Sequence, residues 1–242
     1  MNSASVSSTT YAVPPTSPVG LPIAGTDDLF PVRRVYCVGR NYAAHAREMG
    51  FDPDREPPFF FCKPNDDASV VPVSAGTTVE IPYPTQTSNY HFEAELVVVI
   101  GKGGSHITVD AAPSHIFGYA VGLDMTRRDL QMKMREQGRP WEIGKAFDFS
   151  APIGPVRRLA DAGEINHGAI TLTVNGQTKQ SSDLKNLIWS VSEVIANLST
   201  LFALQPGDVI FTGTPEGVGA VQRGDAISVT IDGFAPLSVQ IV

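Results

Sequence analysis

The 242-residue sequence predicts an α+β fold that is mainly β and has few helices, and three observations support this class. The 22 glycines and 19 prolines favour turns and short strands over long helices. Apolar stretches of strand length recur along the chain, whereas only one long segment has a clear helical pattern. The length suits one large domain with an ample core, and no obvious break divides the chain.

The N-terminal half begins with a segment that shows no periodicity. Residues 1–28, rich in Ser, Thr and Pro, are predicted to form a flexible extension with little chemistry, and residues 29–242 the folded domain. A short strand is expected to end at Gly39, followed by a short helix that stops at Gly50. Three further apolar strands are expected near residues 59–62, 92–100 and 116–123.

The C-terminal half contains the clearest local signals. Asn175-Gly176 lies between two alternating segments and predicts a tight hairpin. Ser190 and Glu193 form a capping-box pattern that starts a helix, and Pro206-Gly207 is expected to end it. The expected apolar stripe of this helix consists of Val191, Val194, Ile195, Leu198, Leu201 and Phe202. The remainder reads as strand, glycine-rich loop, strand, turn and strand.

The bulk properties exclude several classes of partner. The formal net charge of -7 and the absence of a basic run argue against nucleic acid and anionic membranes. No apolar stretch is long enough to cross a bilayer, and no secretory signal precedes the domain, so a cytoplasmic location is expected. Two cysteines form no disulfide framework, which is consistent with a reducing compartment.

The segment HFEAEL, residues 91–96, places two acids in a strand that is apolar on both faces. Glu93 and Glu95 share one face, where they repel each other unless a cation or protons neutralise them. The alternative is that both acids are solvated at the strand end. Asp124, which follows the strand at 116–123 and shares a face with small residues, would complete a site for Mg²⁺, Mn²⁺ or Ca²⁺. His91 on the same face is left out of the site.

Three other stretches hold candidate catalytic groups. In a helix, His45 and Glu48 share a face, so Glu48 can hydrogen-bond His45 and help it to act as a general base. The alternative is an exposed ion pair. Lys145, between Gly144 and Ala146, can stabilise an oxyanion or bind a carboxylate, unless it merely extends to solvent. The loop FTGTPEGVG, residues 211–219, can present backbone donors to an anion, or is an ordinary turn.

Taken in order, these segments resemble the fumarylacetoacetate hydrolase family. The resemblance covers essentially everything from about residue 30 to the C-terminus. The matching stretches are GRNYAAHAREM, FFFCKP, HFEAELVVVIG, GYAVGLDMTRRDLQ, GKAFDFSAPIGP and GDVIFTGTPEGVG. Six matches in sequence make a chance resemblance very improbable.

The resemblance implies a mixed β-roll or sandwich fold, a homodimer and a divalent metal, Mg²⁺ with Mn²⁺ or Ca²⁺ as alternatives. Glu93, Glu95 and Asp124 would bind the metal. His45 and Glu48 would activate water, on a segment that in this family often orders over the substrate as a lid. Lys145 would act in the substrate pocket. The implied substrate-binding residues are Arg40, Arg128, Gly213 and Thr214.

The implied activity is metal-dependent hydrolysis of a carbon–carbon bond in a 2,4-dioxo acid. Within the family, the chain is most similar to members that convert fumarylpyruvate and water into fumarate and pyruvate in aromatic (gentisate) catabolism. Alternatives inside the family are hydrolysis of another acylpyruvate or decarboxylation of oxaloacetate. An alternative of another class is a non-catalytic β module whose acids hold a structural Ca²⁺.

Overall fold

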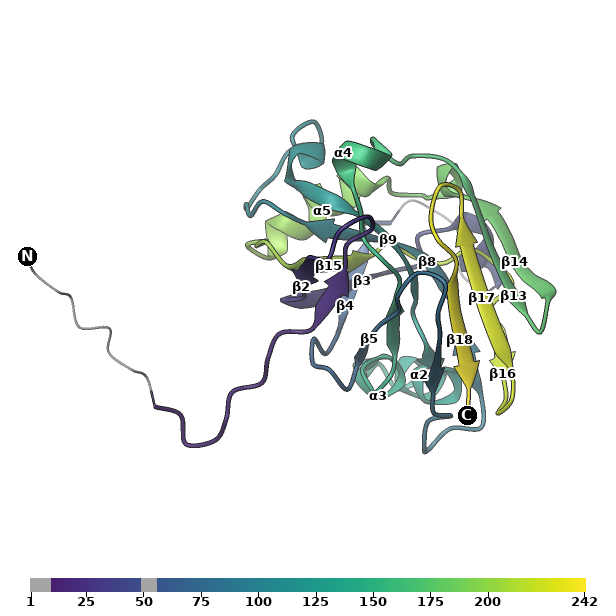
Figure 1. Ribbon diagram of the computed structural model, residues 1–242. Helices are drawn as coiled ribbons and strands as arrows, with labels where there is room; N and C mark the ends of the chain where they lie inside the picture. The colour runs from purple at the N-terminus through teal and green to yellow at the C-terminus, as the bar shows by residue number, and fades with distance from the viewer. Residues whose placement is uncertain (1–9, 49–55) are drawn as a thin grey trace, which may run out of the picture.

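The computed structural model describes residues 10–48 and 56–242, and it confirms a mainly β fold. The largest sheet is mixed and has eight strands (Figure 1). Its order is β4 (Phe59–Lys63), β3 (Arg34–Gly39), β15 (Asp208–Phe211), β8 (Ala94–Ile100), β9 (Ile116–Leu123), β11 (Ala151–Ile153) and β5 (Val70–Pro72), with β12 (Arg157–Arg158) also paired to β9.

A second sheet of five strands lies beside the large one, on the right in Figure 1. Its order is β14 (Gln177–Asp183), β13 (Ala169–Val174), β17 (Ala226–Ile231), β18 (Leu237–Ile241) and β6 (Thr78–Ile81). Two smaller sheets complete the β structure. They are β10 (Thr126–Arg127), β7 (Tyr90–Phe92) and β16 (Gly219–Val221), and the pair β1 (Gly20–Pro22) and β2 (Leu29–Pro31).

The described residues form five α-helices and two 3-10 helices. They are α1 (Ala43–Glu48), α2 (Arg128–Glu136), α3 (Glu142–Lys145), α4 (Leu159–Ala162), α5 (Val191–Leu201), η1 (Ala112–His115) and η2 (Leu184–Asn186). Helices α2 and α3 lie together at one end of the large sheet (Figure 1). Among these described helices, none combines the length and apolar character needed to span a membrane. The predicted stop of α1 at Gly50 lies outside the described residues.

Helix α5 confirms the predicted capping box but not the predicted end. Ser190 accepts a hydrogen bond from the Glu193 backbone, and the Glu193 side chain accepts one from the Ser190 backbone. The helix ends at Leu201 rather than near Pro206, because Phe202 adopts an extended backbone. Leu201 is 65 % exposed, so it does not extend the buried stripe, and the Phe202 ring packs instead on Tyr36.

Strand β8 is buried on both faces, as the apolar residues on both of its faces predict. Leu96 and Val98 pack in one hydrophobic cluster, which reaches helix α5 and the five-stranded sheet. Val97 and Val99 pack in a second cluster on the opposite face. The predicted hairpin is also present: Asn175 and Gly176 both adopt the positive φ values that a tight turn between β13 and β14 requires.

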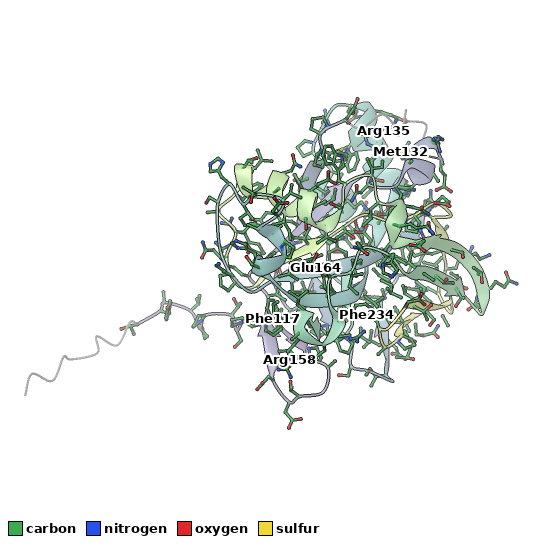
Figure 2. The ribbon with its side chains drawn as sticks, turned by 90° about the horizontal axis from the view of Figure 1, so that it is seen from above. Phe117, Met132, Arg135, Arg158, Glu164 and Phe234 are labelled. Atoms are coloured by element: carbon green, nitrogen blue, oxygen red, sulfur yellow. The ribbon has the colours of Figure 1, made fainter. Side chains whose placement is uncertain are left out.

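The folded part begins earlier than the predicted boundary at residue 28. Strand β1 pairs with β2, and Val19, Leu21 and Ile23 are buried. Their alternation is masked in the sequence by the intervening Pro18, Gly20 and Pro22. Residues 10–18 are largely exposed and extend away from the body of the molecule in both views (Figures 1 and 2).

Candidate active site

The three predicted metal ligands meet where the chain passes from one sheet to another. Glu93 lies between β7 of the three-stranded sheet and β8 of the eight-stranded sheet, and Glu95 is the second residue of β8. Asp124 directly follows β9, the antiparallel neighbour of β8, and its backbone N–H donates to Glu93 O at 2.9 Å. One oxygen from each carboxylate lies within 4.8 Å of the others.

All three carboxylates are buried. Glu93 is 4 % exposed, Glu95 2 % and Asp124 1 %, so the alternative of solvated acids at a strand end is wrong. The small residues of β9 that share a face with Asp124 do not leave space for a ligand beside it. A Cβ on Gly122 would lie 2.5 Å from Val97 and 2.7 Å from Phe211, so the missing side chain admits core residues rather than a ligand.

Two lysines and an arginine neutralise much of the acidic cluster. Lys145 Nζ donates to Glu93 Oε2 at 2.7 Å, to Asp124 Oδ2 at 2.8 Å and to Thr126 Oγ1 at 2.8 Å. Lys63 Nζ lies 2.8 Å from Asp124 Oδ1, and the Arg128 guanidinium pairs with Glu93. Burial would lower the pKa of Lys145, but Asp124 and Glu93 raise it above its ordinary value, so this ammonium stays charged.

The two glutamates respond differently to this environment. Burial would raise the pKa of Glu93, but the charges of Lys145 and Arg128 outweigh it and hold the pKa well below its usual range. Burial raises the pKa of Glu95 well above its usual range, and the charges of Asp124 and Glu93 add to the effect. Glu95 accepts a hydrogen bond from Gly213 N at 2.6 Å.

These residues fit a divalent metal ion. Glu95 is buried beside two other carboxylates, and it can remain there by taking up a proton or by binding a cation. Carboxylate oxygens at this spacing are the ligands that Mg²⁺, Mn²⁺ and Ca²⁺ prefer. The oxygen cluster, and not a Cys or His set, therefore defines the class of ion that the site suits.

The predicted pair of His45 and Glu48 lies on α1, beside the acidic cluster. His45 Nδ1 lies 3.2 Å from Glu48 Oε2, and the Glu48 carboxylate accepts from Gly217 N at 3.1 and 3.2 Å. His45 is 6 % exposed, which does not fit a surface ion pair. Burial lowers the pKa of His45, whereas the carboxylates Glu93 and Glu48 raise it.

A small cavity of about 30 Å³ brings the candidate residues together. It is lined by Val38, Gly39, Arg40, His45, Phe61, Glu93, Glu95, Arg128, Gln131, Trp141, Lys145 and Thr214. The cavity thus collects seven of the ten predicted site residues. The other three, Glu48, Asp124 and Gly213, contact residues of this lining directly. The volume has room for about two water molecules.

The predicted substrate-binding residues differ in how much they are already engaged. The Arg40 guanidinium lies over the Phe59 ring, 4.8 Å from its centre, and its backbone has a φ of 59°. Arg128 is held by Glu93 and by Gln131. Thr214 Oγ1 accepts a hydrogen bond from Gln180 Nε2 at 2.9 Å.

The cavity lies toward the end of the molecule that carries α2. Figure 2 shows Met132 and Arg135, from α2, at the opposite end from Phe117 and Arg158. Strand β9 therefore runs from Phe117 toward the site, where it ends before Asp124. His91, left out of the predicted site, supports it: its Nδ1 accepts from Arg128 Nε at 3.4 Å, and burial lowers its pKa to about 4.

Four residues of the site were not predicted from the sequence. Lys63 ends an apolar stretch, a placement as unusual for a solvated lysine as that of Lys145. Gln131 lies three residues after Arg128 on α2, a helical spacing that also could have been noticed. Asn41 and Gln180 act through contacts with distant segments, so no local pattern in the sequence marks them.

Comparisons with known proteins agree with this geometry. The family model described as "Fumarylacetoacetate (FAA) hydrolase C-terminal" matches residues 34–242. The chain is 52 % identical over 172 residues to a fumarylpyruvate hydrolase of a Ralstonia species, which covers 70 % of this chain and 86 % of the relative. It is 39 % identical over 209 residues to oxaloacetate tautomerase YcgM of Escherichia coli strain K12, covering 85 % and 91 % of the two chains.

A solved structure is more similar still. The crystal structure of fumarylpyruvate hydrolase from Pseudomonas aeruginosa in complex with Mn²⁺ and pyruvate matches with a TM-score of 0.94 and 63 % sequence identity. The match covers 96 % of this chain and 99 % of that chain. Likeness of this extent in sequence and in fold leaves one conclusion: the chain belongs to the fumarylacetoacetate hydrolase family.

Proposed function

We propose that this chain is a metal-dependent hydrolase that converts fumarylpyruvate and water into fumarate and pyruvate. The observation that carries the proposal is the cluster of three buried carboxylates within 4.8 Å, which lies at one cavity with His45 and Lys145. The names of the Ralstonia and Pseudomonas relatives, and the Mn²⁺ and pyruvate in the latter structure, support the same reaction.

Glu93, Glu95 and Asp124 would hold the divalent ion, which we propose to be Mg²⁺, with Mn²⁺ or Ca²⁺ as alternatives. When bound, such an ion supplies positive charge for the 2-oxo acid end of the substrate and for the enolate that leaves as pyruvate. The burial of the three acids keeps water from competing with these contacts.

His45 would act as the general base. With Nδ1 facing Glu48, its Nε2 is the nitrogen that takes the proton from water. Because the pKa of His45 is lowered by burial, the imidazole is neutral at physiological pH. Water then adds to the C4 carbonyl, the C3–C4 bond breaks, and protonated His45 returns the proton to C3 of the pyruvate enolate.

Lys145 would stabilise the oxyanion that forms at C4. Its three N–H donors are directed to Glu93, Asp124 and Thr126, so one of these contacts must be released before the ammonium can donate to the oxyanion. Its raised pKa supports this role, since the group remains a cation throughout.

Arg40, Arg128, Thr214 and the Gly213 region would bind the carboxylate ends of the substrate. The present cavity of about 30 Å³ is far smaller than a seven-carbon diacid, so lining side chains must move to admit it. Phe61 and Trp141 line this cavity. The Trp141 ring contacts the Phe61 and Phe59 rings, and all three residues are half-buried.

Oxaloacetate is the second candidate substrate, because the E. coli relative is named for its tautomerisation. Decarboxylation of oxaloacetate needs no attack by water, so it depends less on the base, whereas tautomerisation still needs a group that moves the C3 proton. We therefore expect His45→Gln to abolish fumarylpyruvate cleavage while metal binding persists. If the wild type consumes only oxaloacetate, and His45→Gln does so equally well, the hydrolase proposal fails.

We further propose a homodimer that works in aromatic (gentisate) catabolism in the cytoplasm. The family resemblance supports these statements, and light scattering on the purified protein tests the dimer. A non-catalytic module with a structural Ca²⁺ is less well supported. It gives no reason for a buried His45 and Lys145 in the same cavity.

A further inference from the structure

Gln180 is the one buried residue of β14, whose other residues are exposed or half-buried. It has 0 % exposure, whereas its neighbours Lys179 and Ser181 on β14 are exposed. Burying an amide side chain costs free energy unless its polar atoms find partners. The side-chain partners of Gln180 are Ala94, which lies between Glu93 and Glu95, and residues 214–216 of the loop that contributes Thr214 to the cavity.

The Gln180 amide joins two segments of the site. Its Oε1 accepts from Ala94 N at 3.0 Å, between the two glutamates of the acidic cluster. Its Nε2 donates to Thr214 Oγ1 at 2.9 Å and to Pro215 O at 2.8 Å. A backbone N–H can only donate and a backbone carbonyl can only accept, so these partners fix the orientation of the amide.

This orientation decides what Thr214 can do. A hydroxyl has one proton to donate, and here its oxygen already receives a proton from Gln180. The proton of Thr214 is therefore available for another acceptor. Thr214 lines the cavity with Glu95 and Lys145, where the proposed substrate presents carboxylate and oxo oxygens.

We propose that Gln180 is a positioning residue that makes Thr214 a hydrogen-bond donor to an anionic oxygen of the bound substrate. The inference rests on the function proposed above. It adds to that function a reason why the strand β14 belongs to the active site. Gln180 also ties the 213–217 loop to the chain between Glu93 and Glu95, so it sets the distance between the acids and the hydroxyl.

A bulge in the hairpin brings Gln180 into position. Leu172 pairs with Gln180 while Thr173 pairs with Thr178, so one extra residue is inserted in β14. The carbonyl of this extra residue approaches Gly217 so closely that a Cβ there would lie 2.2 Å away. Such bulges occur next to active sites, where they redirect a side chain.

Two substitutions separate the role of the amide from simple packing. Gln180→Glu keeps the shape but replaces the donor by an acceptor, so Thr214 would donate to it rather than to the substrate. Gln180→Met removes the donor without adding charge. Thr214→Val removes the hydroxyl at constant size, and Thr214→Ser retains it.

The test is calorimetric titration of pyruvate into the Mn²⁺-loaded full chain, with Mn²⁺ titrated separately into the metal-free protein. Loss of one hydrogen bond to a charged oxygen predicts pyruvate binding that is about 10- to 100-fold weaker in both Gln180 variants and in Thr214→Val. In Gln180→Met and Thr214→Val, which leave the charge around the acids unchanged, Mn²⁺ affinity should stay within about threefold of the wild type. Thr214→Ser should bind pyruvate like the wild type.

The double variants give the decisive comparison. If Gln180 acts through the Thr214 hydroxyl, Gln180→Met adds little further loss in a chain that already carries Thr214→Val. Additive losses, or a Gln180→Met variant with wild-type affinity, would overturn the inference. If the Gln180 variants do not fold, Thr214→Val alone decides: wild-type pyruvate binding in that variant overturns it.

Failure of the proposed function gives a different result. A wild type that binds Mn²⁺ but neither binds pyruvate nor cleaves fumarylpyruvate would remove the function and this inference together. A wild type that does both, with Gln180 variants that match it, would remove the inference alone.

Discussion

Replacing Glu95 by Gln should separate the cost of burying a carboxyl from the benefit of binding a metal. In the metal-free protein, Glu95→Gln removes a carboxyl that lies next to Glu93 and Asp124 and whose pKa is raised by burial and by their charges. The oxygen of the new amide can still accept from Gly213 N. The metal-free variant should therefore melt at the same temperature as the wild type or higher.

The metal-loaded proteins should differ in the opposite sense. At a free Mn²⁺ concentration of about 100 times Kd, binding stabilises the native state by about 2.7 kcal/mol. For a chain of 242 residues this corresponds to a rise in Tm of about 5 to 10 °C. A hundredfold loss of affinity in the variant leaves about 0.4 kcal/mol, a rise of only about 1 °C.

Differential scanning fluorimetry with and without Mn²⁺ measures the melting temperatures of the wild type and of Glu95→Gln. Glu164→Gln, at an exposed glutamate, is the matched control and should retain the full metal-dependent rise. A Glu95→Gln variant that retains the full rise would refute the assignment of Glu95 as a ligand. A metal-free variant that melts several degrees below the wild type would refute the view that this carboxyl is destabilising without a cation.

Three further predictions concern the general base His45, the residue Asn41 before α1, and the loop that contains Gly217. Because the Glu48 carboxylate raises the pKa of His45, Glu48→Gln should move the acid limb of the kcat/KM profile to lower pH and slow the reaction. Asn41→Ala should lower the free energy of unfolding by about 2 to 4 kcal/mol in urea titrations, because the buried side chain makes three hydrogen bonds, two with residue 189 and one with residue 212. Gly217→Ala places a Cβ 2.2 Å from a backbone oxygen and should cut activity at least tenfold, whereas Gly224→Ala, with a similar φ and no neighbour within 4 Å, should not.

Each of these has an opposite outcome that would count against the structure. An acid limb that moves to higher pH in Glu48→Gln would mean that this carboxylate does not stabilise protonated His45. An Asn41→Ala protein as stable as the wild type would mean that its hydrogen bonds are made equally well by water. Equal activity in the two glycine variants would mean that the close approach of the loop has no catalytic consequence.

Local patterns predicted the parts of the fold that local forces decide. Apolar residues on both faces of β8 predicted its burial on both sides, and the Asn175-Gly176 pair predicted the hairpin turn, in which both residues adopt a positive φ. The capping box of α5 also depends on neighbouring residues only. The end of α5 was missed: Phe202 has an extended backbone, and its ring packs on Tyr36, which lies far away in the sequence.

The site divides in the same way. Two acids in a strand that is apolar on both faces are unusual, and they predicted a buried acidic site. The burial of Glu93 and Glu95 agrees with that prediction. The ion pair of Lys63 with Asp124 and the amide contact of Gln180 with Thr214 join segments that are far apart in the chain. Such pairings depend on sheet topology, which the pattern of one strand does not encode.

The most direct measurement is anomalous diffraction at the manganese edge from crystals grown with Mn²⁺ and pyruvate. We predict one strong peak between the carboxylates of Glu93, Glu95 and Asp124, with pyruvate bound against it on the side of His45. An active protein whose crystals show Mn²⁺ elsewhere, with the three acids paired only to Lys63, Lys145 and Arg128, would contradict this prediction.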